Sequence, residues 1–281
     1  MKIGFKTAQA NVEWPALLAT WQLADEMPVF DSGWLFDHFV ALGSDGGGAH
    51  EGWTLASALA ARTTRLQLGH LVLGNTYRHP ALLGRMAATL DHVATGRFVL
   101  GLGAGWHAPE HAMYGWRLPP PGERVEMLHS AVRVLQQMWN EPTGATLEAP
   151  PFRLADATTQ PPPFTSGGPP IWLGTQGPRG LRICAELADG WNHTGAPETF
   201  IGKRDTLMRQ CEAVERDPGE IEISAQAFLR DGDYAALVET ASHYARSGAR
   251  HLILIMPARE GPDGLRRLAE RAAQPLRERF A

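Results

Sequence analysis

Strand-like and helix-like segments alternate along the whole sequence, and this alternation constrains the fold more than any other feature. Each expected strand is a short apolar run followed by a segment with helical spacing of apolar residues. The runs cover residues 2–6, 33–36, 65–73, 97–102, 171–173, 190–192, 221–228 and 251–256. Eight strands, each followed by a helix, predict an α/β protein: a single (β/α)8 TIM barrel over residues 1–281.

A doubly wound open sheet would show the same alternation, but its nucleotide-binding fingerprint is missing. The only glycine pattern of that kind, Gly101-Leu102-Gly103-Ala104-Gly105, follows the fourth strand and lacks the GxGxxG spacing. The sequence therefore favours the closed barrel.

The alternation lapses between the fourth helix and the fifth strand. Residues 141–170 are rich in proline and polar side chains, with three prolines in a row at 161–163. We interpret this segment as an excursion outside the barrel, with a small hairpin around Phe152. Because structureless loops of this length are uncommon in compact domains, the excursion is also a candidate functional region.

Composition and charge exclude several functional classes. The formal net charge of −4 gives no bulk basic field, so we expect no nucleic-acid partner. No apolar run approaches 18 residues, so we expect no membrane span. The N-terminus lacks the pattern of a signal peptide, which makes the cytoplasm the expected location. Cys184 and Cys211 have no metal-site spacing and are expected to be core thiols.

In a barrel of this kind, functional residues gather where the strands end. The second strand ends in Asp37 and His38, an acid and an imidazole that could handle protons or bind a ligand. The alternative is an aspartate that caps a loop and a histidine that fills a gap. Glu51 is a further catalytic candidate, because it directly follows a glycine-rich loop that contains Gly43, Gly46, Gly47 and Gly48.

The third and fourth strands end in small residues. Gly74 and Asn75 allow close approach of the backbone to a ligand, or else simply form a turn into the next helix. Gly101, Gly103 and Gly105 remove side chains from one face, which leaves room for a flat ring or a phosphate. Close packing of a helix on the barrel is the alternative. The residues that follow, Glu110, His111 and Tyr114, either serve the site or begin the next loop.

The fifth strand ends in Gly174-Thr175-Gln176-Gly177, directly before a helix that begins near Pro178. Free N–H groups and the helix dipole make such a turn a candidate phosphate site, and a simple capping loop is the alternative.

No metal site is expected, despite eleven histidines. Metal-dependent barrel hydrolases commonly place an HxH pair at the end of strand one, where this chain has Lys6-Thr7-Ala8-Gln9. The GxSxG nucleophile motif and the Walker A motif are also absent from the sequence.

At these same positions the sequence resembles the luciferase-like monooxygenase superfamily, and within it the coenzyme F420-dependent oxidoreductases. The resemblance is carried by FDHFVALG, by residues 51–115 ending in GLGAGWHAPEHAMYG, and by PIWLGTQGPRGLRICAELADGWN. The terminal segments MKIGFKTAQANVEW and GARHLILIMPA extend it over nearly the whole chain. It implies a barrel fold, oxidoreductase activity and the deazaflavin cofactor F420.

The resemblance also implies roles for individual residues. Asp37 and His38 flank the deazaflavin, with His38 near the ring carbonyl region. A non-prolyl cis peptide between Leu71 and Val72 bulges behind the ring. Gly74 and Asn75 lie beside the ring and its ribityl chain. The cofactor groove is lined by Gly103, Gly105, Trp106 and His107. The cofactor phosphate is held by Gly174, Thr175, Gln176 and Gly177.

Three positions depart from the pattern of the relatives. Trp106 stands where relatives acting on glucose 6-phosphate carry a catalytic Glu, which argues against oxidation of a sugar phosphate. Many relatives have Asn in place of His107 and a second Gly in place of Gln176. The phosphate site is therefore expected to differ in detail.

Together these observations predict hydride transfer between C5 of F420 and a small organic substrate that the sequence does not identify. The cofactor would supply the redox chemistry, and Asp37, His38 and Glu51 are the candidate catalytic residues. The alternatives are an FMN-dependent luciferase-like monooxygenase and a non-catalytic protein that binds a flavin or deazaflavin. We also expect a homodimer.

Overall fold

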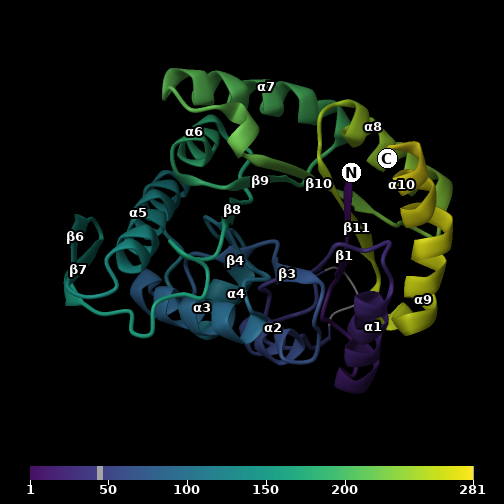
Figure 1. Cartoon of the computed structure of the whole chain (residues 1–281), viewed down its shortest axis with the longest axis horizontal. Coiled ribbons are helices and arrows are strands. Elements are labelled where there is room, and N and C mark those ends of the chain that lie inside the picture. Colours follow the sequence, from purple (N-terminus) through teal and green to yellow (C-terminus); the bar gives the residue numbers. More distant parts are fainter. Residues whose placement is uncertain (43–46, 281) are drawn as a thin grey trace.

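A closed barrel of parallel strands forms the centre of the computed structural model, which describes residues 1–42 and 47–280 (Figure 1). Strand β1 pairs with β2 on one side and with β11 on the other, and β3 pairs with β5, so the sheet closes on itself. The strands are β1 (Lys2–Thr7), β2 (Ser32–Leu35), β3 (Gln67–His70), β4 (Leu73–Gly74), β5 (Phe98–Gly103), β8 (Ile171–Leu173), β9 (Gly190–His193), β10 (Glu222–Phe228) and β11 (His251–Met256).

The expected third strand, residues 65–73, is divided into β3 and β4. Both parts pair with β5, so together they occupy one of the eight positions around the barrel. Between them lies the predicted cis peptide bond between Leu71 and Val72, which is confirmed. The (β/α)8 prediction is confirmed as well.

Helices surround the barrel (Figure 1). Several begin with proline in the first turn, where the missing N–H has no partner to lose. They are α1 (Trp14–Glu26), α2 (Gly52–Ala60), α3 (Pro80–Ala94), α5 (Pro121–Asn140), α6 (Pro178–Leu187), α7 (Pro197–Ala213), α8 (Tyr234–Arg246), α9 (Gly261–Leu268) and α10 (Gln274–Arg279). A π-helical turn, Ala269–Ala273, joins α9 to α10.

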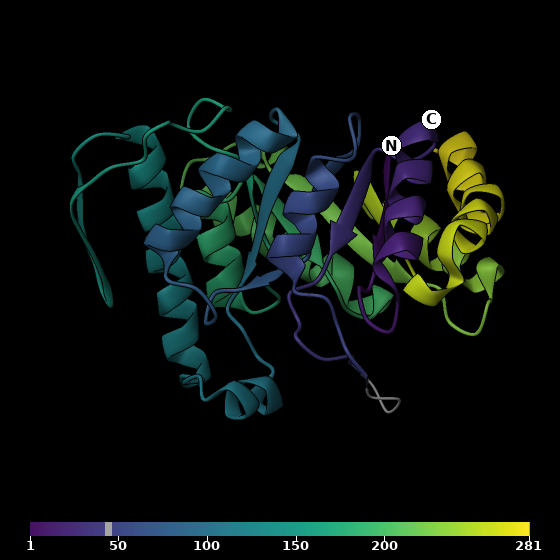
Figure 2. The same cartoon turned by 90° about the horizontal axis from the view of Figure 1, so that it is seen from below.

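One helix was not expected from the sequence. Helix α4 (Ala108–Tyr114) follows β5 and projects from the same end of the barrel as the loop that leaves β2 (Figure 2). Of the glycine-rich loop predicted there, Gly43 and Gly46 lie outside the described residues. Because both segments leave the carboxyl ends of strands, they can bring side chains to the same site.

The predicted hairpin in the excursion is confirmed. Strands β6 (Ala145–Ala149) and β7 (Phe152–Ala157) pair antiparallel outside the barrel, next to α5 (Figure 1). The buried Phe152 and Leu154 anchor the hairpin. Ser130 of α5 donates a hydrogen bond to the Pro150 carbonyl at 2.6 Å. The hairpin therefore packs on the outer helical layer.

The lower interior of the barrel is packed with side chains. Trp34, Leu71, Val99, Trp172 and Ile253 form one buried cluster, in which the rings of Trp34 and Trp172 stack with centroids 5.0 Å apart. This packing closes the barrel below the site, so the space for a ligand lies at the carboxyl ends of the strands.

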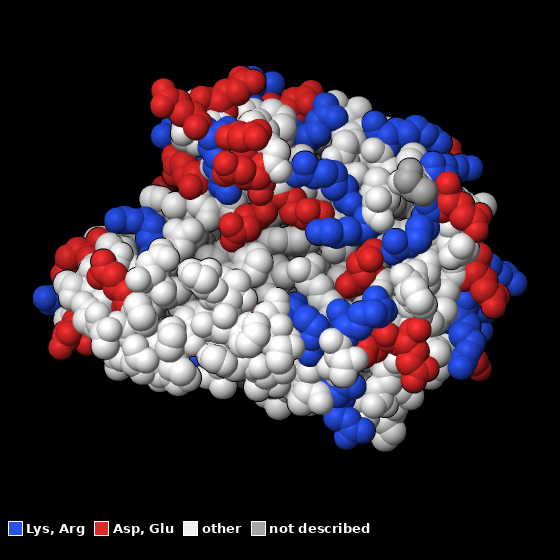
Figure 3. Space-filling model, viewed as in Figure 1, with Lys and Arg blue, Asp and Glu red and all other residues white. Residues whose placement is uncertain are grey.

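The surface differs in charge from one side to the other. Acidic and basic side chains are interspersed over α7 and α8, whereas the region over α3 carries few charges (Figure 3). In the described part of the chain, no helix combines the length and the apolar character that a membrane crossing requires.

Candidate active site

A cavity of about 790 Å³ opens at the carboxyl ends of the strands. Its size is within the usual range for small-molecule and cofactor sites. Residues from every position around the barrel line it, including Lys6, Ala8, Phe36, Asp37, His38, Leu71, Val72, Gly74, Tyr77, Gly103, Gly105, Trp106, Gly174, Thr175, Gln176, Thr194, Gln226, Phe228, Ile255 and Arg259. Most of the predicted site residues therefore meet in one place.

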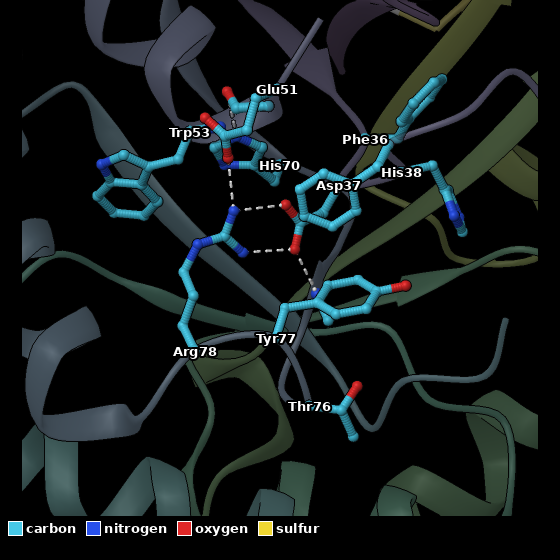
Figure 4. A network of polar contacts seen from close by, with 12 residues as sticks. Phe36, Asp37, His38, Glu51, Trp53, His70, Thr76, Tyr77 and Arg78 are labelled. Atoms are coloured by element: carbon cyan, nitrogen blue, oxygen red, sulfur yellow. Dashed lines mark hydrogen bonds and ion pairs between the residues drawn. The ribbon is translucent and has the colours of Figure 1, made fainter. Parts of the chain in front are cut away.

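Asp37 is held in a two-pronged ion pair with Arg78 (Figure 4). The two Asp37 oxygens accept from Arg78 Nη1 at 2.7 Å and Nη2 at 2.9 Å, and one of them also accepts from the Gly74 N–H at 2.9 Å. Bidentate pairs of this kind fix geometry strongly. The arrangement favours Asp37 as a residue that positions Gly74 and Arg78, so its predicted role in proton transfer stays a prediction.

Glu51 joins the same network but begins a helix. Its carboxylate accepts from the N–H groups of Trp53 and Thr54, at 3.0 and 2.6 Å, and so caps α2. Arg78 also binds it, at 2.6 Å. Burial alone would raise the pKa of Glu51, but these hydrogen bonds and the Arg78 charge outweigh burial and lower it. Glu51 is not among the described residues that line the cavity, and this arrangement favours capping over catalysis.

His38 turns away from Asp37 (Figure 4) and contacts Glu110 of the unexpected helix α4. His38 Nδ1 lies 2.9 Å from Glu110 Oε2, and Tyr77 donates its hydroxyl to the same oxygen at 2.7 Å. The other carboxylate oxygen accepts from the N–H groups of Phe39 and Val40, at 2.7 and 3.2 Å. Glu110 is fully buried, yet its donors reverse the effect of burial.

Burial alone would raise the pKa of Glu110. The hydrogen bonds from His38, Tyr77 and Phe39 outweigh it, and the pKa falls to about 2. Glu110 is therefore a fixed negative charge that orients the His38 ring. From the sequence, two interpretations of Glu110 remained open: a residue of the site, or the beginning of the next loop. The structure brings it to the site.

His38, His107 and Glu110 together have the donor set of a possible metal site. His107 Nδ1 lies 3.2 Å from the Glu110 carboxylate, and the corresponding distance from His38 is 2.9 Å. The His38 contact is a hydrogen bond, whereas His107 Nδ1 is buried and has no hydrogen-bond partner in the described structure. The expected absence of a metal stays a prediction.

The glycines at the ends of β5 and β8 make room for Val72. A Cβ atom at Gly103 would lie 2.6 Å from Val72 Cγ2, and one at Gly174 would lie 2.8 Å from Val72 Cγ1. We expected Gly103 to leave room for a flat ring or a phosphate, and Gly174 to belong to a phosphate-binding turn. The space beside them admits the Val72 side chain, and all three residues line the cavity wall.

The remaining predicted residues lie around this wall. Gly105 has φ of +82°, and a Cβ there would meet Thr76 Oγ1 at 2.5 Å. Trp106 is 62% exposed and lines the cavity, whereas His107 precedes α4 beside Glu110. Asn75 is only 3% exposed, and its side-chain amide finds no partner in the described structure. A bound polar group could satisfy that amide.

The turn from Gly174 to Gly177 is held by β9 and opens beside a helix N-terminus. Trp191 Nε1 donates to the Thr175 carbonyl at 2.8 Å, and Gln176 Nε2 donates to the Asn192 carbonyl at 3.3 Å. Gly177 directly precedes α6, and a Cβ placed there would meet nothing within 4 Å. Lys203 approaches the turn through Gln176 Oε1 at 3.3 Å. Open space, a helix dipole and a cation together suit an anion.

Lys6, Tyr77 and Gln226 are among the cavity residues that were missed as site residues. The available signal for Lys6 was a lysine at the carboxyl end of a short strand, in a chain with only three lysines. Tyr77 and Gln226 carried no comparable signal, because their neighbours in the site lie far away in the sequence.

Comparisons with known proteins agree with this geometry. The family model for luciferase-like monooxygenases matches residues 4–279, and the chain belongs to that family. An F420-dependent glucose-6-phosphate dehydrogenase of Microbacterium testaceum is 29% identical, over 100% of this chain and 99% of the relative. One of the same name from Kineococcus radiotolerans is 32% identical, over 87% of this chain and 73% of the relative.

A solved structure is similar in fold. An F420-dependent secondary alcohol dehydrogenase in complex with an F420-acetone adduct superposes with a TM-score of 0.84, covering 96% of this chain and 98% of that chain. Sequence identity is 18%, so the likeness concerns the fold. Both comparisons support the predicted barrel of a luciferase-like enzyme.

Proposed function

We propose that the protein is an F420-dependent oxidoreductase that transfers a hydride between C5 of the deazaflavin and a carbon atom of a small organic substrate. The observation that carries the proposal is that a cavity wall suited to a ring and a site suited to an anion lie at the same end of the barrel. Val72 forms the wall, and the N-terminus of α6 at Gly177 lies at the same end of the barrel. Curated relatives with F420-dependent activity match the chain along its length.

The residues present suit a deazaflavin nucleotide-like ligand. The ring would lie against Val72, the phosphate at Gly177, and polar groups of the connecting chain near the unsatisfied amide of Asn75. When bound, F420 supplies the hydride chemistry, and the barrel supplies orientation and electrostatics.

His38 is the residue we assign to proton handling. Glu110 engages Nδ1 of the ring, and no described residue hydrogen-bonds Nε2. His38 lines the cavity, so Nε2 can accept a proton from a substrate hydroxyl or return one to a substrate carbonyl. Asp37 acts through its ion pair with Arg78, which fixes the loop beside the wall.

The substrate is expected to differ from a sugar phosphate. Trp106 stands at the cavity rim, where relatives acting on glucose 6-phosphate carry a catalytic Glu. Phe36 and Phe228 add further apolar surface to the lining. A largely apolar alcohol or carbonyl compound suits this lining better than a phosphorylated sugar.

The proposal is tested by fluorescence titration with F420 and FMN in parallel. We expect F420 to bind at least tenfold tighter, a difference of about 1.4 kcal/mol. Equal affinity, or tighter binding of FMN, would favour an FMN-dependent monooxygenase instead. Tight F420 binding without turnover of any alcohol or carbonyl substrate would indicate a carrier.

The expected homodimer is also a proposal. The face over α3 carries few charges (Figure 3), and it exposes Leu82 and Val93, which are 57% and 44% accessible. A surface that binds a partner typically carries a contiguous apolar patch, and the low charge of this face favours it as the candidate. Light scattering on the purified protein measures the mass in solution, and a monomer would contradict the proposal.

A further inference from the structure

Lys6 lies at the carboxyl end of β1 and lines the cavity, although only 9% of it is exposed. Its Nζ donates to the Leu71 carbonyl at 2.6 Å and to Gln226 Oε1 at 3.0 Å. An ammonium group has three N–H donors. The described residues provide no third acceptor, so one donor is left for a ligand.

A chain of hydrogen bonds fixes the partners of Lys6. Gln226 Nε2 donates to Asn192 Oδ1 at 2.5 Å, and Asn192 Nδ2 donates to Ser224 Oγ at 2.9 Å. The Ser224 hydroxyl in turn donates to the Trp191 carbonyl at 3.1 Å. Because each amide nitrogen is committed, Gln226 must present its oxygen to Lys6. The site therefore holds the ammonium with neutral acceptors and without a carboxylate.

No other charged or titratable group in the described structure forms an ion pair or hydrogen bond with Lys6. In the cavity, Asp37 pairs with Arg78 and His38 pairs with Glu110. Other titratable or charged groups on the barrel strands and their ends include His70 on β3, His193 on β9, His251 on β11 and Arg259 after β11. None of these makes an ion pair or hydrogen bond with Lys6 in the described structure.

This environment is costly for a cation. Burial lowers the pKa of Lys6 to about 7. An uncompensated buried charge is unfavourable, and side chains in this situation often serve a ligand. The Leu71 carbonyl that Lys6 binds belongs to the residue before Val72, so the ammonium lies beside the proposed ring wall.

We propose that Lys6 is a cofactor-binding residue whose free N–H binds an electron-rich oxygen or nitrogen at the edge of the bound deazaflavin. The inference rests on the proposed function. A fixed cation at that edge binds more strongly as electron density accumulates there, which is how preorganised charges assist a reaction. In the bound state the Lys6 ammonium would then stabilise negative charge on the cofactor edge. The cofactor atom would in turn provide the third acceptor that the ammonium lacks.

Nuclear magnetic resonance can test this directly, because the chain contains only Lys2, Lys6 and Lys203. Protein labelled with ¹³C-lysine should give three side-chain Cε signals, and Lys6→Met assigns the Lys6 signal. We expect saturating F420 to raise the proton affinity of Lys6 at least tenfold. Lys2, which pairs with Glu222 at 3.4 Å, should titrate as before and serves as the internal control.

Linkage gives a second readout. The protonated form of Lys6 binds, so the Kd for F420 in the wild type should rise at least tenfold between pH 6 and pH 9. Lys6→Met should remove this dependence, whereas Lys2→Met should keep it.

If Lys6→Met fails to fold, Gln226→Glu provides the test. The new carboxylate would keep Lys6 charged, and the affinity should then stay nearly constant from pH 6 to pH 9.

The outcomes separate the two proposals. Normal F420 binding with an unshifted Lys6 titration, or with unchanged pH dependence in Lys6→Met, overturns the role of Lys6 and leaves the proposed function intact. Failure of the wild type to bind F420 at any pH overturns the proposed function, and the role of Lys6 with it.

Discussion

Glu110→Gln is the substitution that most sharply tests the site. It preserves the shape of a fully buried side chain but removes its charge. It also places either an NH₂ group or a weaker amide oxygen against the donors that converge on Glu110 from His38, Tyr77 and the backbone. These donors would lose a charged acceptor while remaining buried.

The magnitude follows from the Glu110 pKa, which falls from 4.5 to about 2 in the folded protein. Such a depression corresponds to about 3 kcal/mol of folding free energy at neutral pH. Because the folded pKa is the lower one, this stability is present above pH 4.5 and is lost as the pH falls through about 2. At pH 3, about half of it should remain.

Urea unfolding, followed by circular dichroism from pH 7 down to pH 3, measures the effect. We expect wild type to exceed Glu110→Gln by about 3 kcal/mol at pH 7, with the difference roughly halved at pH 3. Titration of other carboxylates cancels in the difference between the two proteins. A difference that stays constant over this range would refute the assignment of Glu110 as a buried, ionised acceptor.

Two further predictions concern binding and turnover. Gly177→Glu should place a carboxylate in the open space before α6 and abolish F420 binding without changing the circular dichroism spectrum. If this variant binds F420 with normal affinity, the cofactor phosphate does not lie at Gly177. His38→Ala should lower turnover by roughly a hundredfold or more while changing F420 affinity little, since proton transfer acts in the transition state. Steady-state kinetics measure the turnover of the variant. Unchanged turnover would show that His38 only packs in the site and does not transfer protons.

The sequence predicted the barrel and the location of the site, because both depend on local patterns. Apolar runs and helical spacing locate the elements, and the rule that barrel sites lie at strand ends selected Asp37 and His38. The contacts of those residues depend on pairs far apart in the chain. His38 meets Glu110 across 72 positions, so no local pattern could reveal that pairing.

Helix α4 was missed because it is short and begins directly after the glycine-rich end of β5. The π-helical turn at Ala269–Ala273 carried no signal in the sequence pattern. The sequence also did not reveal that Gly103 and Gly174 make room for Val72. A glycine pattern shows that side chains are excluded, but the group that takes the space, here Val72, is set by the tertiary structure.

The pairing of β1 with β11 has a consequence for biosynthesis. Lys2 lies opposite His251 in this ladder, and Lys6 reaches Gln226 on β10 across 220 positions. Contacts of such high sequence separation form slowly, because the intervening chain must first be ordered. The ribosome must therefore release almost the entire polypeptide before the barrel closes. Cofactor acquisition would follow synthesis, and a chain stalled before β11 would expose unpaired strand edges to aggregation.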